Sequence, residues 1–197
     1  MKLVATVGND KEIAMAENAD VIEIRLDLFD DFRRMSLDKE MILTFRKVAD
    51  GGKFEGSDKE RVETLKSLSD ELNADYVDLE FDLPDWAFDF DCKIIESYHN
   101  FKETPEYSEL ERIVKNRRGD FAKIVTMGKS RKDVEKIVKL LVNHDNVISF
   151  LMGEKFSFTR IMAAYLGSPF IYCYVGERKA PGQIHLDDAQ RILRILR

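Results

Sequence analysis

A lysine stands within an apolar stretch of the sequence, where its charge is unexpected. Lys123 lies in the run FAKIV, which has the length and composition of a buried strand. Lysine is almost never fully buried unless it is paired or has a function. Desolvation and nearby cations, here Arg25, Arg46 or Arg160, would favour the neutral amine, and a neutral amine attacks ketones and aldehydes to form an iminium. Lys123 is therefore a candidate nucleophile.

Further polar side chains alternate with apolar ones in the neighbouring stretches, which places them on one face of each strand. They are Glu23, Arg25, Asp27, Thr44, Arg46, Asp78, Glu80, Ser97 and His99. The opposite faces are apolar and suited to packing under helices, so these polar groups are expected to point inward. A histidine beside a reactive lysine suits proton abstraction next to a carbonyl, which leads to aldol cleavage or dehydration.

Eight apolar, β-branched runs recur along the chain, and each is typical of a buried strand. They span residues 3–7, 21–26, 41–45, 76–79, 93–98, 121–127, 147–152 and 170–175. Strands that alternate with helices pair in parallel, and eight such units favour closure into a barrel. The sequence therefore predicts a (β/α)8 barrel formed by one domain, residues 1–197. An open doubly wound sheet is the alternative, but no glycine-rich phosphate loop follows any of these runs.

Helix start signals lie between several of these runs. Residues 58–72 follow Ser57 and have Glu60 at the third helical position, which is a capping box. Further helices are expected over 131–142 and 186–196. Thr104 is expected to cap another helix, with Pro105 at its first position. Residues 83–91 favour a loop.

Composition excludes several classes of protein. The formal net charge is −6 and there is no long basic block, so a nucleic-acid surface is not expected. No segment approaches the ~20 apolar residues that cross a bilayer, and the first residues are too short an apolar stretch for a signal peptide. Cys92 and Cys173 belong to no C-x-x-C pair and are expected to be buried free thiols. We therefore expect a cytoplasmic protein that binds a small molecule.

Several short motifs occur in barrel order along the whole chain. They are Glu23-Ile24-Arg25-Leu26-Asp27, Thr44-Phe45-Arg46, Ser97-Tyr98-His99-Asn100-Phe101, Lys123-Ile124-Val125-Thr126-Met127, Met152-Gly153, Thr159-Arg160 and Ala180-Pro181-Gly182-Gln183-Ile184. Each is weak alone, but together they resemble the type I 3-dehydroquinate dehydratases, Schiff-base enzymes on a (β/α)8 barrel. The resemblance runs from the first strand to the last helix.

The resemblance implies a role for each matching position. Lys123 would form an iminium with the ketone of 3-dehydroquinate, and His99 would carry the proton in a syn elimination to 3-dehydroshikimate, a step of the shikimate pathway and of aromatic amino-acid biosynthesis. The binding residues would be Glu23, Arg25 and Arg46 for the ring hydroxyls and Arg160 and Gln183 for the carboxylate. No metal or organic cofactor is expected, since the iminium accepts the electrons. Lys123→Ala is expected to abolish turnover with little loss of folding.

Three positions depart from the family pattern. Phe156 stands in the region after Met152-Gly153 where the family has a glycine, so the entry to the following helix is expected to differ. Asp50 stands where the family usually has a glutamate that orients the histidine, so it is one methylene shorter. Lys179 stands where the family usually has serine or threonine, and it either clamps the carboxylate or faces solvent. The family often forms homodimers, so a homodimer is compatible with the resemblance, although no stretch of the sequence identifies an interface.

Three other functions stay open at this point. A class I aldolase-like barrel would need a phosphate site in its last two loops. A metal-dependent hydrolase using His99 with Asp78 or Glu80 lacks a second well-placed histidine. A binding protein without turnover could keep the same scaffold.

Overall fold

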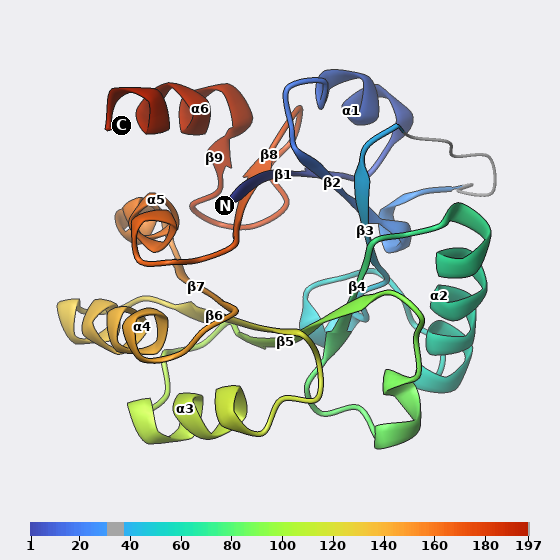
Figure 1. Ribbon diagram of the computed structural model, residues 1–197, viewed down its shortest axis with the longest axis horizontal. Helices are drawn as coiled ribbons and strands as arrows, with labels where there is room; N and C mark the ends of the chain where they lie inside the picture. The colour runs from blue at the N-terminus through green and yellow to red at the C-terminus, as the bar shows by residue number, and fades with distance from the viewer. Residues whose placement is uncertain (31–37, 197) are drawn as a thin grey trace.

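The computed structural model describes residues 1–30 and 38–196, in which a parallel sheet curls into a barrel with helices outside it (Figure 1). The strands are β1 (Lys2–Val7), β2 (Val21–Arg25), β3 (Glu40–Thr44), β4 (Tyr76–Glu80), β5 (Lys93–Asn100), β6 (Phe121–Met127), β7 (Val147–Met152), β8 (Phe170–Tyr174) and β9 (Ile184–His185). The eight predicted strands are present with ends shifted by at most two residues, and the short β9 was not predicted. The expected α/β barrel is confirmed.

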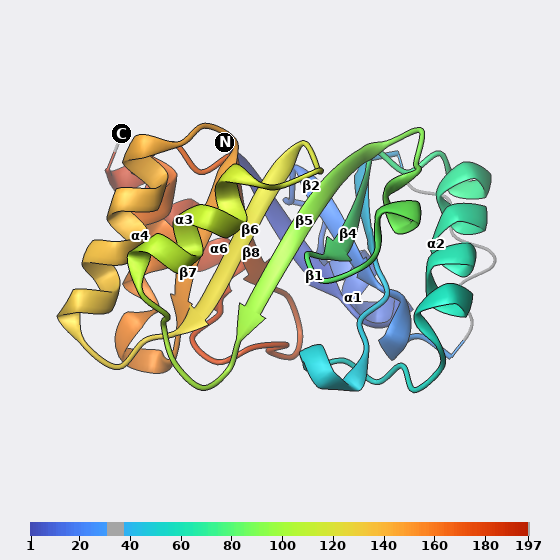
Figure 2. The ribbon, with the colours of Figure 1, turned by 90° about the horizontal axis from the view of Figure 1, so that it is seen from below.

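The hydrogen-bonded ladder follows the order β7-β6-β5-β4-β3-β2-β1-β8-β9, and each pair is parallel. Among the described residues β7 and β8 are not hydrogen-bonded neighbours, so the ladder is open at this seam. Helix α5 (Phe158–Tyr165) packs against both strands and covers the opening from outside. In Figure 2 the arrowheads of β5 and β6 point to the edge where the segment between β8 and β9 also lies.

The other helices are α1 (Asp10–Met15), α2 (Asp58–Leu72), α3 (Tyr107–Lys115), α4 (Arg131–Asn143) and α6 (Leu186–Ile195). The predicted capping box of α2 is confirmed, because the Ser57 backbone N–H donates to Glu60 and the Glu60 N–H donates to the Ser57 hydroxyl. The predicted cap at Thr104 is wrong. Its hydroxyl instead lies 2.9 Å from the hydroxyl of Thr126 in β6, and α3 begins three residues later. Residues 83–91 contain a single 3-10 turn, Asp85–Phe88.

Side chains fill the barrel below its mouth. Tyr76, Phe121 and Phe170 are the first residues of β4, β6 and β8, and their ring centroids lie 5.3 to 6.1 Å apart. Aromatic rings at these separations make favourable tilted and edge contacts. A barrel closed at the amino ends of its strands leaves the opposite end for a pocket.

Both cysteines were expected to be buried free thiols. Cys173 is buried and Cys92 only half-buried, and burial raises their pKa values to about 12 and about 11, so both thiols stay protonated at neutral pH.

Within residues 1–30 and 38–196, no helix combines the length and apolar character that a membrane crossing requires.

Candidate active site

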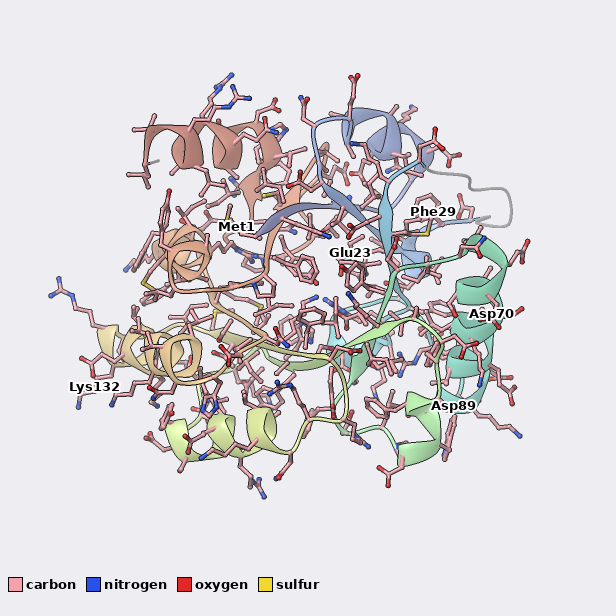
Figure 3. The ribbon with its side chains drawn as sticks, in the orientation of Figure 1. Met1, Glu23, Phe29, Asp70, Asp89 and Lys132 are labelled. Carbon is pink, nitrogen blue, oxygen red and sulfur yellow. The ribbon has the colours of Figure 1, made fainter. Side chains whose placement is uncertain are left out.

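A pocket lies at the carboxyl ends of the strands. It has about 530 Å³ of empty space, part of which is open to solvent, and this is a size suited to a small organic molecule. Its polar lining residues are Thr6, Glu23, Arg25, Arg46, His99, Lys123, Arg160, Tyr172, Lys179 and Gln183. The structure therefore gathers every predicted site residue except Asp50 around one pocket. In Figure 3 Glu23 lies inside the ring of strands, whereas Asp70, Asp89 and Lys132 lie on the outside.

The amine of Lys123 is buried and paired. Its Nζ donates a hydrogen bond of 2.7 Å to Asp78 Oδ2 and lies 3.5 Å from Glu23 Oε1. The same atom lies 3.9 Å from the centroid of the Tyr172 ring, a cation–π distance. Nearby arginines were expected to influence this lysine, and the structure adds that its ion-pair partners are Asp78 and Glu23. These two carboxylates come from β2 and β4, and β4 is separated from β6 by β5 alone.

Asp78 is the principal partner of this lysine. Burial alone would raise the pKa of Asp78, but the charge of Lys123, with a further contribution from Arg46, holds that pKa below its usual value. The Ser97 hydroxyl donates 2.7 Å to the second oxygen of Asp78. Glu80 does not join this group, since it pairs at 2.7 Å with Arg61 of α2.

Glu23 is fixed from two neighbouring strands. The hydroxyls of Thr6 in β1 and Thr44 in β3 donate to its two oxygens at 2.7 and 3.0 Å. Thr6 is the register partner of Glu23, and Thr44 is the register partner of Arg25, two residues farther along the same face of β2. The carboxylate is therefore held in place in the pocket next to the Lys123 amine.

His99 is half-buried at the pocket wall. Loss of solvent around the ring, and then the charges of Arg46 and Lys123, lower the pKa of His99 well below its usual 6.5. The imidazole is therefore neutral at pH 7 and able to accept a proton. The ring stacks on Phe101, with centroids 6.2 Å apart and an angle of 15° between the planes.

Asp50 is not among the residues that line the pocket, although its neighbour Gly51 is. Asp50 Oδ2 and His99 Nδ1 are both buried, and neither has a hydrogen-bond partner among the described residues. Burial raises the pKa of Asp50, and Lys47, 3.9 Å away, opposes this shift. Gly51 has a φ of 76°, and a Cβ there would lie 2.8 Å from Phe101, so glycine lets this loop approach the histidine's stacking partner.

Arg160 provides a buried positive charge. Its Nε donates to the Gly182 carbonyl at 3.0 Å, and its guanidinium carbon lies 4.0 Å from the centroid of the Phe150 ring. Nη2 is buried without a hydrogen-bond partner, and no carboxylate pairs with this arginine in the described part of the chain. Burial lowers the pKa of Arg160 to about 10, so it stays charged at neutral pH. An unpaired guanidinium in a pocket suits an anionic ligand.

The remaining predicted residues differ in how firmly they are held. Arg25 forms two hydrogen bonds with Asp27, at 2.9 and 2.7 Å, so its guanidinium has a fixed orientation. Arg46 lines the pocket without a carboxylate partner among residues 1–30 and 38–196. Gln183 is buried and accepts the Lys179 backbone N–H at 2.8 Å. The Lys179 side chain neither faces solvent nor lies free, since it pairs with Glu12 at 2.6 Å.

Two polar pocket residues were missed by reasoning from the sequence, namely Thr6 and Tyr172. Tyr172 alternates with Phe170 and Tyr174, a pattern that indicates core rather than a site. Its hydroxyl is buried and has no hydrogen-bond partner in the described part of the chain, and burial raises its pKa well above 10. Across the described ranges, no group of three or more His, Cys, Asp or Glu side chains is arranged to hold a metal ion.

Fold and site together define an α/β-barrel enzyme whose pocket combines a buried amine, a neutral imidazole and an unpaired guanidinium. The model of the type I 3-dehydroquinase family matches residues 4–197. The chain belongs to this family of hydro-lyases.

Individual relatives agree with this assignment. A 3-dehydroquinate dehydratase of Archaeoglobus fulgidus is 66% identical over 193 residues, which cover 98% of each chain. One from Methanopyrus kandleri is 32% identical over 196 residues, covering 93% of this chain and 90% of that one. The solved type I 3-dehydroquinate dehydratase of Clostridium difficile, 22% identical, has the same fold, with a TM-score of 0.85 over 99% of this chain and 91% of that one.

Proposed function

We propose that this protein converts 3-dehydroquinate to 3-dehydroshikimate through a Schiff base on Lys123, with His99 as the proton carrier. The supporting observation is that a buried amine, a neutral imidazole and an unpaired guanidinium line one pocket. Family membership supports the substrate, and these residues support the mechanism. The iminium serves as the electron sink, so the scheme needs no cofactor.

The first stage is formation of the imine. Lys123 gives up one proton before it attacks the ketone, and Asp78 and Glu23 lie 2.7 and 3.5 Å from Nζ, within reach of that proton. Attack gives a carbinolamine, which loses one water to form the iminium. The carboxylates then stabilise the positive charge that stays on nitrogen.

The second stage is elimination. Neutral His99 takes a proton from the carbon next to the iminium, which becomes an enamine. The enamine expels the ring hydroxyl, and His99 returns its proton so that water leaves. A second water hydrolyses the conjugated iminium and regenerates the amine. Formation and hydrolysis of the imine cancel, so the net reaction loses one water.

The polar side chains that line the pocket are proposed to orient the substrate. In this scheme Arg160 and Gln183 hold the carboxylate, and Glu23, Arg25 and Arg46 contact the ring hydroxyls. The buried, unpaired Nη2 of Arg160 is the donor that a carboxylate would satisfy. Lys179 contributes to this wall while paired to Glu12.

Asp50 is proposed to orient His99 by accepting a hydrogen bond from Nδ1. Asp50→Glu should leave kcat unchanged or slightly raised, because the longer side chain reaches the buried Nδ1 more easily. Asp50→Asn should lower kcat by roughly tenfold or more, since an amide orients the neutral ring less well. Steady-state kinetics of both variants is the check, and a clear loss of activity in Asp50→Glu would contradict the assignment.

Borohydride trapping tests substrate and nucleophile together. The protein is mixed with 3-dehydroquinate and borohydride, and intact-mass and peptide mass spectrometry locate the adduct. We expect one reduced adduct on Lys123 in the wild type and in Lys179→Ala, a control that removes the other amine of the pocket. An adduct on Lys179, or the absence of any adduct in an active enzyme, would overturn the mechanism.

Two further expectations belong with this proposal. We expect the enzyme to act in the cytoplasm and to form a homodimer. Sedimentation at micromolar concentration checks the second expectation.

A further inference from the structure

The carboxylate of Glu12 is buried at the edge of the active site, although no motif of the sequence points to it. Glu12 lies in α1 and is 3% exposed. Its Oε2 accepts the backbone N–H of Gly8 at 2.8 Å. Its Oε1 accepts the N–H of Glu177 at 3.0 Å and the ammonium of Lys179 at 2.6 Å. A buried carboxylate with three donors, one of them charged, is a strong anchor.

These donors tie α1 to the 176–183 segment, which joins β8 to β9. Gly176 begins the segment with a φ of 62°, and a Cβ there would lie 2.9 Å from Glu12 Oε1. The left-handed backbone favours glycine, and a side chain here would crowd the Glu12 carboxylate. The two elements are 167 positions apart along the chain at Glu12 and Lys179, so this is a tertiary contact that no local pattern indicates.

The anchored segment forms one wall of the pocket. Lys179 and Ala180 donate their backbone N–H groups to Gln183 Oε1 at 2.8 and 3.2 Å. The Gln183 amide lies 3.4 Å from the Thr6 hydroxyl, which in turn donates to Glu23. The contacts of Glu12 with the 176–183 segment therefore help to place residues that line the pocket.

We propose that Glu12 is a positioning residue of this active site. It does not line the pocket, and it fixes the 176–183 segment so that Lys179, Ala180 and Gln183 are placed before substrate arrives. The Glu12–Lys179 pair also sets where the Lys179 ammonium stands at the pocket wall. A pocket wall that is already ordered lowers the entropy cost of binding substrate. Loss of Glu12 is therefore expected to change mainly KM. This inference rests on the proposed function for its kinetic readout.

The chain contains a matched control in Glu96, on the outer face of β5 and away from the pocket. Glu96 is 5% exposed and also accepts two backbone N–H groups, from Arg118 and Gly119, together with the Arg118 guanidinium at 2.9 Å. Replacing either glutamate with glutamine removes the charge and turns an NH2 toward a donor. Glu12→Gln and Glu96→Gln are therefore expected to lower Tm to a similar extent.

Kinetics separates positioning from stability. Glu12→Gln is expected to raise KM for 3-dehydroquinate by about tenfold while kcat changes much less, and Glu96→Gln is expected to leave both near wild type. Lys179→Met and the double variant Glu12→Gln/Lys179→Met complete a cycle. If the two residues act as a pair, the double variant resembles the more affected single variant. Multiplied effects would show that Lys179 binds substrate independently of Glu12.

Limited trypsin digestion gives a readout that does not depend on turnover. Arg178 lies in the anchored segment with an exposed side chain, and intact-mass spectrometry reports cleavage after it. Cleavage there is expected to be faster in Glu12→Gln than in Glu96→Gln. A KM within twofold of wild type together with unchanged cleavage would overturn the proposal. An inactive wild type would instead overturn the proposed function and leave the cleavage comparison valid.

Discussion

Lys123→Ala is expected to lower kcat for dehydration by on the order of 10⁴-fold or more, because no iminium forms without the amine. The remaining pocket still binds substrate through Arg160 and Gln183, so equilibrium binding is expected to persist. Rapid-quench assays and calorimetric titration with 3-dehydroquinate measure the two properties separately. Turnover at the wild-type rate would exclude the Schiff base.

The structure alters the expected effect of Lys123→Ala on the free energy of unfolding. Little loss of folding was expected from the sequence, but Lys123 is the main cation beside buried Asp78. Removing one partner of a buried ion pair destabilises proteins by about 3–5 kcal/mol. We therefore expect the free energy of unfolding at pH 7 to fall by an amount in this range. Adding Asp78→Asn, which removes the uncompensated carboxylate, should restore part of it without restoring activity.

The pH dependence of this effect has a definite sign. In the wild type the pKa of Asp78 is lowered, so its stabilisation is present above pH 3.8 and lost as the pH falls further. Without Lys123, burial would raise the pKa of Asp78, and its destabilisation would be greatest at neutral pH. The stability gap between wild type and Lys123→Ala should therefore narrow from pH 7 to pH 5 in urea titrations. A gap that widens toward acid would contradict the pairing.

The second large effect is expected for His99→Ala. General acid–base groups contribute about 10²–10⁴-fold, so kcat should fall by that factor while the amine still forms an imine. Borohydride should then trap the substrate-derived adduct, which accumulates before elimination. An unchanged kcat would remove His99 from the mechanism. Loss of the adduct would show that the histidine is required earlier, in imine formation.

The pH profile tests the surroundings of the same histidine. Its pKa is lowered by burial and by Arg46 and Lys123, so the neutral base persists below the usual 6.5. The acid limb of kcat/KM set by His99 should therefore lie below pH 6.5. Arg46→Met removes one of these cations and should move the limb upward. A limb at or above 6.5 in the wild type would contradict the environment described for this ring.

Local pattern was sufficient for the strands and for most of the pocket lining. Period-two alternation placed Glu23 and Lys123 on the inner face, because successive side chains of a strand point to opposite sides. The carboxyl ends of parallel strands meet at one edge, so polar residues of β2 to β6 were expected to converge there. Glu23, Arg25, Arg46, His99 and Lys123 do line the pocket, whereas Asp27, Thr44, Asp78, Glu80 and Ser97 do not. The capping box before α2 depends on residues three apart and was equally accessible from the sequence.

The sequence by itself determined that Glu23, His99 and Lys123 face the pocket. The tertiary structure decided their partners, and it paired Glu80, also expected to point inward, with Arg61 of α2. Lys123 meets Asp78 from 45 positions away, and Lys179 meets Glu12 from 167 positions away. The Thr104 hydroxyl bonds to β6 instead of capping a helix, and within the described residues β7 and β8 are not paired by backbone hydrogen bonds. Alternation along a strand sets the direction in which a side chain points. The distance from that side chain to the side chains of other strands depends on the stagger between strands and on the path of the connecting loops. Those depend on packing of the whole chain, so a charge can be placed inside the barrel before its counter-charge is known.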